Sequence, residues 1–200
     1  MDTSEEEREY RMKHRMPAII FAGGKSSRMG QDKALLPFGG FGTLAQYQYE
    51  RLQKYFDEVY ISTKEEKFDF KAPLIHDRYT VHSPLAGIVS VFETLKHDNV
   101  FILSVDAPFV DNSVITKLME EDEAQYDTVI ARTEDGLQPL CGIYKRSILT
   151  LAREQLQQNS HRLGYLLQQA KSHEVFFEDE MLFSNLNHLH EYEAACGQLT

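Results

Sequence analysis

The feature that most constrains the fold is an alternation of short apolar runs with helical patterns. Runs typical of buried strands occur at residues 17–22, 58–62 and 100–105, with a shorter one around residues 74–77. Between the first two, apolar residues recur at helical spacing: Ala45, Tyr49, Leu52 and Phe56. Strands that alternate with amphipathic helices are typical of α/β domains, in which helices cover both faces of a parallel sheet. We therefore predict a three-layer, doubly wound, mostly parallel sheet.

The second half of the chain continues this alternation. Ser83 and Pro84 suit the start of a helix, because serine caps free N–H groups and proline fits the first turn. The run at 100–105 is apolar on both faces, which predicts a central strand that ends at Asp106. Later strands are predicted at 128–131, 140–144 and 175–177, and helices from 111 to 118, 148 to 156, 163 to 170 and at the C-terminus. Without a repeat or a long linker, residues 17–200 are predicted to form a single domain, preceded by a charged extension, residues 1–16.

Composition excludes several classes of function. The chain has 200 residues and 42% hydrophobic content, enough to bury a sizeable core. Its formal charge of -10 argues against general affinity for nucleic acid or an anionic membrane. Two distant cysteines, Cys141 and Cys196, offer neither a disulfide framework nor a zinc site. The sparse cysteines fit a reduced protein, which we expect to be cytoplasmic. No apolar run approaches the roughly 20 residues of a membrane span.

Positive charge is nevertheless concentrated in one glycine-rich segment, FAGGKSSRMGQDKALLPFG (residues 21–39). Its basic residues are Lys25, Arg28 and Lys33. Gly23 and Gly24 allow backbone amides to approach an anion closely, and the cations supply the charge that a polyphosphate requires. The segment is not a P-loop, which needs a glycine where Ile19 stands. From these residues alone, a phosphate-binding loop and an ordinary turn with solvated cations both remain open.

Two aspartates fall at the ends of other predicted strands. Ligands of open parallel sheets bind beyond the carboxyl ends of the strands, so Asp77 and Asp106 are candidates for the same site. Asp106 suits Mg²⁺, which prefers hard oxygen ligands; the alternative is a helix cap, which Asp111 can already supply. Asp77 can accept hydrogen bonds from a bound ligand, or it can simply form a turn.

The glycine-rich segment resembles the signature of the molybdenum cofactor guanylyltransferases, the MobA family. The same order continues with HSPLAGI (82–88), SVDAPFV (104–110), QPLCGIY (138–144) and SNLN (184–187), so the resemblance spans residues 17–192. It implies a Rossmann-like nucleotidyltransferase fold of the glycosyltransferase-A-like kind. It also implies Mg²⁺-dependent transfer of GMP from GTP to molybdopterin, with release of pyrophosphate and formation of the molybdopterin guanine dinucleotide cofactor. Transient contact with proteins that make or receive the molybdenum cofactor is implied as well.

The resemblance further implies a set of site residues. Lys33 and Asp106 would contact the phosphates, Asp106 would also hold the metal, and Arg28 is a third catalytic candidate unless it pairs with Asp32. The residues expected around the nucleotide are Phe21, Ala22, Gly23, Gly24, Lys33, Ser62, Asp77 and Asp106. Of these, Asp77 would accept hydrogen bonds from the donors on the edge of guanine. Those expected on the acceptor side are Gln138, Arg162, Asn185 and Asn187.

The chain departs from the family pattern at Ser62, where an asparagine often occurs, so contacts to the nucleoside can differ.

Three alternatives to the guanylyltransferase remain open at this point. A related transferase could use CTP, or it could use a sugar phosphate as acceptor. A nucleotide- or pterin-binding module without catalysis is the third, although such a module would not need both Lys33 and Asp106. His188 and His190 do not have the spacing of a shared metal face.

Overall fold

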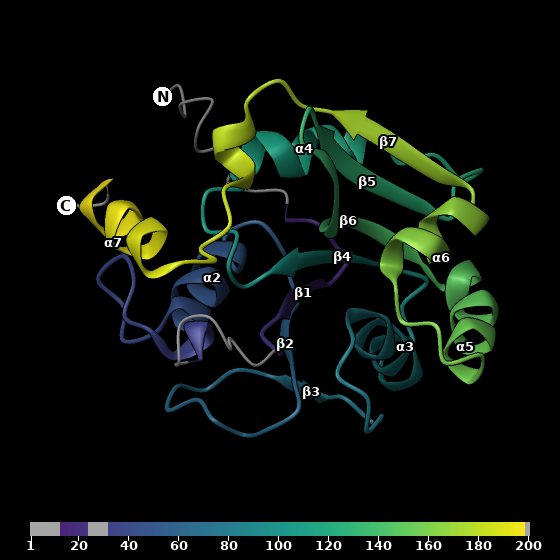
Figure 1. Cartoon of the computed structure of the whole chain (residues 1–200), viewed down its shortest axis with the longest axis horizontal. Coiled ribbons are helices and arrows are strands. Elements are labelled where there is room, and N and C mark those ends of the chain that lie inside the picture. The colour runs from purple at the N-terminus through teal and green to yellow at the C-terminus, as the bar shows by residue number, and fades with distance from the viewer. Residues whose placement is uncertain (1–12, 24–31, 199–200) are drawn as a thin grey trace, which may run out of the picture.

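The computed structural model describes residues 13–23 and 32–198, and a mixed sheet lies at their centre (Figure 1). Within this part of the chain the sheet has seven strands in the order β3-β2-β1-β4-β6-β5-β7. The strands are β1 (Ala18–Phe21), β2 (Val59–Thr63), β3 (Leu74–His76), β4 (Asn99–Ser104), β5 (Thr128–Thr133), β6 (Gly136–Lys145) and β7 (Ser172–Phe176). Four of the neighbouring pairs are parallel, and only β6 runs antiparallel, to both β4 and β5. The predicted mostly parallel α/β sheet is confirmed.

Helices cover both faces of this sheet, which gives the predicted three layers. The α-helices are α2 (Leu44–Leu52), α3 (Pro84–Thr94), α4 (Asn112–Glu120), α5 (Leu149–Gln157), α6 (Leu163–Gln169) and α7 (Leu189–Gln198). The 3-10 helices are η1 (Lys33–Leu35), η2 (Arg146–Ile148) and η3 (Glu180–Phe183). Alternate residues of β1 face opposite layers: Ile20 packs in the core beneath α2 and α4, and Ile19 in the core beneath α3, α5 and α6. None of the described helices is long and apolar enough to cross a membrane.

The direction of the strands determines where polar groups gather. β1, β2, β3 and β4 are parallel neighbours, so their carboxyl ends lie along one edge of the sheet. Phe21 at the end of β1 is in register with Ser62 of β2 and Ser104 of β4. In the antiparallel β6, Cys141 pairs with Leu103, so the preceding residues of β6 extend past the end of β4 and border the same edge.

The end of α3 that faces this edge is built as the sequence predicts. Ser83 caps the helix by accepting a hydrogen bond from the backbone N–H of Ala86 at 3.2 Å, and Pro84 occupies the first turn. Asp111 likewise caps α4, which leaves Asp106 without a capping role. The predicted extension reaches the domain at His14, whose backbone N–H donates to the carbonyl of Tyr55 at 2.8 Å; residues 1–12 lie outside the described part.

Candidate active site

A lysine and an aspartate that are distant in the sequence meet at this edge of the sheet. Lys33, in η1, places its Nζ 3.2 Å from Oδ2 of Asp106, which follows β4. The same ammonium donates to Oδ1 of Asn187 at 2.8 Å. The side chains of Lys33 and Asp106 are 15% and 21% exposed, so the pair is largely enclosed yet reachable. Three segments that are distant in sequence thus converge on one charged group.

The loop that carries Asp106 is held from three directions. Ser104 Oγ donates to Asp106 Oδ1 at 2.5 Å. From α2, the fully buried amide of Gln48 donates to the carbonyl of Ala107 at 3.0 Å. From the C-terminal segment, the backbone N–H of Leu186 donates to the carbonyl of Asp106 at 2.9 Å. Such a fixed carboxylate is preorganised, because little conformational freedom remains to be lost when a ligand binds.

A cavity of about 350 Å³ lies between the ends of β1 and β2 and the first turn of α3. Four residues predicted to contact the nucleotide line it: Phe21, Gly23, Ser62 and Asp77. Ala22 does not, because its N–H donates to the carbonyl of Ser62 at 3.0 Å and its own carbonyl accepts from Lys67 Nζ at 2.9 Å. Gly24 and Arg28 lie outside the described residues.

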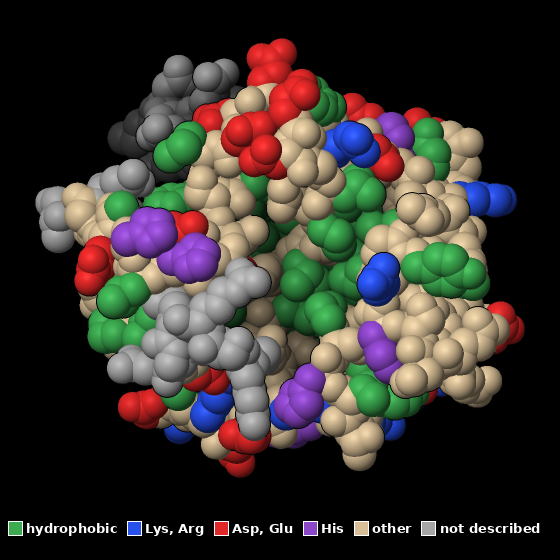
Figure 2. Space-filling view, viewed as in Figure 1, with side chains coloured by type: hydrophobic (Ala, Val, Ile, Leu, Met, Phe, Trp, Pro, Cys, Tyr) green, Lys and Arg blue, Asp and Glu red, His purple; other side chains and the backbone are tan. Residues whose placement is uncertain are grey.

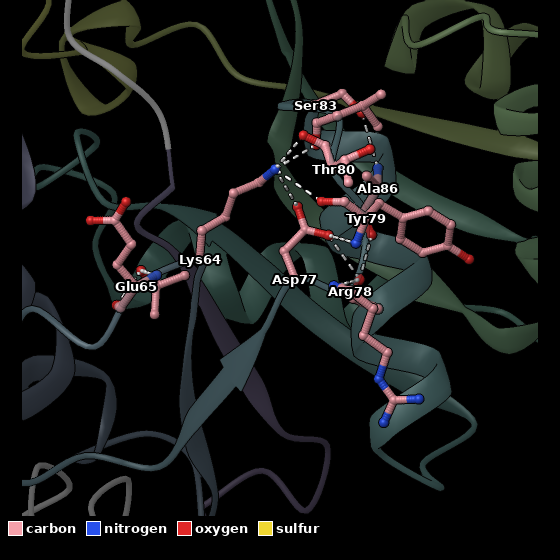
Figure 3. Close-up of polar contacts among 11 residues, drawn as sticks. Lys64, Glu65, Asp77, Arg78, Tyr79, Thr80, Ser83 and Ala86 are labelled. Carbon is pink, nitrogen blue, oxygen red and sulfur yellow. Dashed lines mark hydrogen bonds and ion pairs between the residues drawn. The ribbon is translucent and has the colours of Figure 1, made fainter.

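Two lysines of the β2–β3 connection also line this cavity, and sequence reasoning missed both. Lys67 pairs with the carboxylate of Asp32 and with the carbonyl of Ala22, so it joins two distant positions of the glycine-rich segment. Lys64 reaches the connection between β3 and α3 (Figure 3). The available signal was weak: two lysines in a polar segment after a strand end, which are more often solvated.

Asp77 is nearly buried, with a side chain that is 8% exposed. Its Oδ1 accepts the backbone N–H of Tyr79 at 3.0 Å and lies 3.1 Å from Ser90 Oγ. The expected turn is therefore present. Its Oδ2 lies 3.8 Å from Lys64 Nζ and accepts no hydrogen bond from the residues described, so it retains capacity for a ligand donor.

A second cavity, of about 480 Å³, adjoins the first and is bordered by Asp106. Its lining includes three residues predicted for the acceptor side: Gln138, Arg162 and Asn185. The fourth, Asn187, binds Lys33 instead. Figure 2 shows apolar side chains in a hollow near the centre of the face that is in view. This agrees with the lining of the second cavity, which includes apolar residues of β6, α6 and η3.

One thiol borders the second cavity. Cys141 is buried, and burial raises the pKa of its thiol to about 12. Only the thiolate is strongly nucleophilic, so Cys141 stays protonated and inert near neutral pH. Transfer by a covalent cysteine intermediate is therefore not a chemistry that this site supports.

The amino-acid sequence matches a known family over most of its length. The MobA-like NTP transferase domain matches residues 18–175 of the chain. The chain belongs to this family. Molybdenum cofactor guanylyltransferase from Campylobacter jejuni is 39% identical over 90% of this chain and 95% of its own length. The enzyme of the same name from Helicobacter pylori strain G27 is 34% identical over 90% of this chain and 91% of its own.

Solved structures agree with the fold of this MobA-like NTP transferase. Molybdopterin-guanine dinucleotide biosynthesis protein A from Archaeoglobus fulgidus superposes with a TM-score of 0.79 at 19% identity, covering 92% of this chain and 98% of its own. A 2-C-methyl-D-erythritol 4-phosphate cytidylyltransferase from Thermus thermophilus gives a TM-score of 0.69 at 15% identity, covering 93% and 99%. Because the second protein is named for another base, the shared fold does not decide which nucleotide binds.

Proposed function

We propose that this MobA-like NTP transferase moves GMP from GTP to the phosphate of molybdopterin and releases pyrophosphate. The observation that carries the proposal is the Lys33–Asp106 pair, in which Asp106 borders the second of two adjoining cavities and Lys33 contacts Asp106 without lining either cavity. Ser104, which donates to Asp106, lines both of them. The names of the relatives from Campylobacter jejuni and Helicobacter pylori support the same reaction.

In the proposed reaction, GTP occupies the first cavity and the pterin acceptor the second. A phosphate oxygen of the acceptor forms a bond to the α-phosphorus of GTP. The bond from that phosphorus to the oxygen bridging the β-phosphate breaks, and its electron pair leaves with pyrophosphate. Such a transfer depends on in-line placement and charge stabilisation rather than on a protein nucleophile. Lys33 would place its ammonium at the phosphates, where negative charge accumulates.

Asp106 is the residue proposed to hold Mg²⁺. This ion commonly binds through one or two carboxylates together with substrate phosphates. The donor set fits that mode, because Asp106 offers a fixed carboxylate beside a cavity. In the described part of the chain no group of three or more His, Cys, Asp or Glu side chains gathers to form a metal cage, so the remaining ligands would come from substrate and water. Bound there, the ion would neutralise charge on the phosphates.

The proposed choice of GTP depends on Asp77. Guanine presents two neighbouring donors, N1–H and the 2-amino group, to an acceptor at this edge, whereas cytosine presents no such pair. Oδ2 of Asp77 can accept from one of them. A contact from both donors to both carboxylate oxygens would require Oδ1 to give up a present partner, either the N–H of Tyr79 or Ser90 Oγ.

The test is pyrophosphate release with molybdopterin, Mg²⁺ and each of GTP, CTP and ATP. We expect turnover with GTP, and we expect Asp106→Asn to lower kcat by about 10²–10³-fold through loss of electrostatic stabilisation. Lys33→Ala should lower kcat and raise the KM for GTP together. Asp98→Asn is the control, because Asp98 is exposed and precedes β4, at the end opposite to Asp106.

Each alternative predicts a different result of this panel. Turnover with CTP and not GTP would contradict the assignment of the base. Binding of GTP without pyrophosphate release from any acceptor would identify a binding module. Unchanged kcat in Asp106→Asn would remove Asp106 from the reaction.

A further inference from the structure

Lys64 makes an unusual set of contacts beside the first cavity. It follows directly on β2, and its side chain extends to the connection between β3 and α3 (Figure 3). Its Nζ donates to three successive backbone carbonyls: Tyr79 at 3.0 Å, Thr80 at 3.1 Å and Val81 at 2.8 Å. An ammonium has three donors, so these carbonyls use all of them. Lys64 therefore has no N–H left for a phosphate while the connection stays in place.

The connection that Lys64 holds forms a wall of the nucleotide cavity. It begins after Asp77 and ends at His82 and Ser83, and all three of these residues line the cavity. On its other side Ser90 of α3 accepts the backbone N–H of Arg78 at 3.0 Å. β2 and α3 thus hold this wall from opposite sides, and Lys64 is the only one of the described side chains of β2 and its following connection that donates to carbonyls 79–81.

Lys64 also balances the charge of Asp77. Its Nζ lies 3.8 Å from Asp77 Oδ2, too far for a hydrogen bond but close enough for strong electrostatic attraction where water is limited. Removing the ammonium would leave a nearly buried carboxylate without its nearby cation and would free three carbonyls. Both effects displace Asp77, the residue proposed to read the base.

We propose that Lys64 is a positioning residue that sets guanine selectivity by fixing the β3–α3 connection and the carboxylate of Asp77. This inference rests on the proposed function, because it assigns Asp77 to the edge of guanine. Lys64 acts through other residues and does not touch the phosphates. Its loss therefore weakens recognition of the base more than it slows transfer.

The variant Lys64→Met tests this, since it keeps the aliphatic stem and removes the ammonium. Steady-state rates are measured with GTP and with ITP, which lacks the 2-amino donor of guanine. We expect the KM for GTP to rise about tenfold and kcat to stay within about twofold, as for a lost ground-state contact. The preference for GTP over ITP should shrink, because the proposal assigns the 2-amino group of guanine to Oδ2 of Asp77, and a displaced Asp77 no longer accepts that hydrogen bond.

The control is Lys71→Met, a change of the same chemistry in the same β2–β3 connection. Lys71 is exposed, and no hydrogen bond or ion pair joins it to the rest of the described chain. The KM of Lys71→Met for GTP, and its preference for GTP over ITP, should equal those of the wild type.

Calorimetric titration with GTP and with ITP, in the absence of acceptor, separates the two proposals. If the wild type binds GTP but releases no pyrophosphate, the proposed function fails, and the titration still tests Lys64. A folded Lys64→Met protein that keeps the wild-type GTP:ITP ratio overturns the inference, as does a fall in kcat with unchanged KM. If Lys64→Met does not fold, Lys64→Gln is judged in the same assays by the same criteria.

Discussion

At the scale of single residues, Gly87 is a position where adding one methyl group should disturb the nucleotide cavity. It lies in the first turn of α3, and a Cβ there would stand 2.7 Å from Cε1 of Phe21. Phe21 is 7% exposed and lines the nucleotide cavity, so Gly87→Ala should push its ring toward the ligand. We expect a higher KM for GTP and a loss of about 1–3 kcal/mol in the free energy of unfolding, measured by initial rates and urea denaturation. Gly42→Ala, whose Cβ would meet only ordinary contacts, should change neither, and a normal KM in Gly87→Ala would contradict the argument.

Residues at strand ends were the predictable part of the site. Phe21 and Ser62 lie at the ends of apolar runs and Asp106 directly follows one, so the runs themselves indicate where each strand ends; the family signature also includes Phe21 and Asp106. Gln48 and Lys64 were missed because their roles depend on contacts between distant segments. In sequence, Gln48 is a polar residue within a helical pattern; in the structure it is fully buried against the carbonyls of the Asp106 loop. No local pattern distinguishes such a glutamine from a solvated one.

At the scale of elements, the reversed strand β6 depends on Gly142. This residue pairs with Ile102 of β4 and Ile130 of β5, and a Cβ would stand 2.4 Å from the carbonyl oxygen of Val129. The carbonyl of Val129 cannot move away without breaking hydrogen bonds between the strands. Gly142→Ala should therefore lower the free energy of unfolding by about 3 kcal/mol. The midpoint of urea denaturation should fall with little change in its slope. Gly164→Ala, with no heavy atom within 4 Å of the added Cβ, should keep the wild-type midpoint; equal midpoints in both variants would refute the role of Gly142.

The direction of β6 was not predicted, although strands at 128–131 and 140–144 were. The observed strands are longer, Thr128–Thr133 and Gly136–Lys145, and only two residues separate them. So short a connection permits an antiparallel pair, whereas a parallel crossover needs a dozen or more residues. The mixed polar and apolar residues around the turn obscured the true ends of the two strands. Gly136, whose φ is 125°, was the residue in the sequence that could have indicated a tight turn. By contrast, the N-terminus of α3 was predictable, because Ser83 and Pro84 act locally.

At the scale of the whole molecule, chain length and the strand–helix pattern predicted the three layers, but not the contacts that the C-terminal segment makes with the site. The C-terminal segment returns across the sheet so that Leu186 binds the carbonyl of Asp106 and Asn187 binds Lys33. The SNLN motif placed Asn185 and Asn187 on the acceptor side, but the contact of Asn187 with Lys33 depends on the path of the chain between them, including β7 and η3, and was not predicted. The segment lies beyond residues 18–175, the interval that matches the family. In this acidic chain, with net charge -10, the cationic side chain of Lys33 is thus held by contacts between segments that are distant in sequence.

The stability of the whole molecule in acid should depend on Asp127, which ties the start of β5 to η2 and to the start of β7. Its Oδ1 accepts from Ser147 Oγ at 2.6 Å, and its Oδ2 accepts from the backbone N–H of Lys171 at 2.9 Å. Burial raises the pKa of Asp127, but these hydrogen bonds and the positive charges of Lys171 and Lys145 together outweigh burial and lower it below the ordinary value of 3.8. A carboxyl with a lowered pKa stabilises the fold fully above its unfolded value, and this contribution disappears as the pH falls through the folded value.

The free energy of unfolding of the wild type should therefore decline below about pH 4. Asp127→Asn should lose about 1 kcal/mol at pH 7 and show a shallower decline in acid, because its amide does not titrate. Urea denaturation at several pH values between 7 and 3 measures both effects. The exposed Asp98→Asn serves as the control and should follow the wild-type curve. Parallel curves for Asp127→Asn and the wild type would mean that these hydrogen bonds do not link protonation to folding, and the acid sensitivity of the molecule would then have to arise from its other carboxylates.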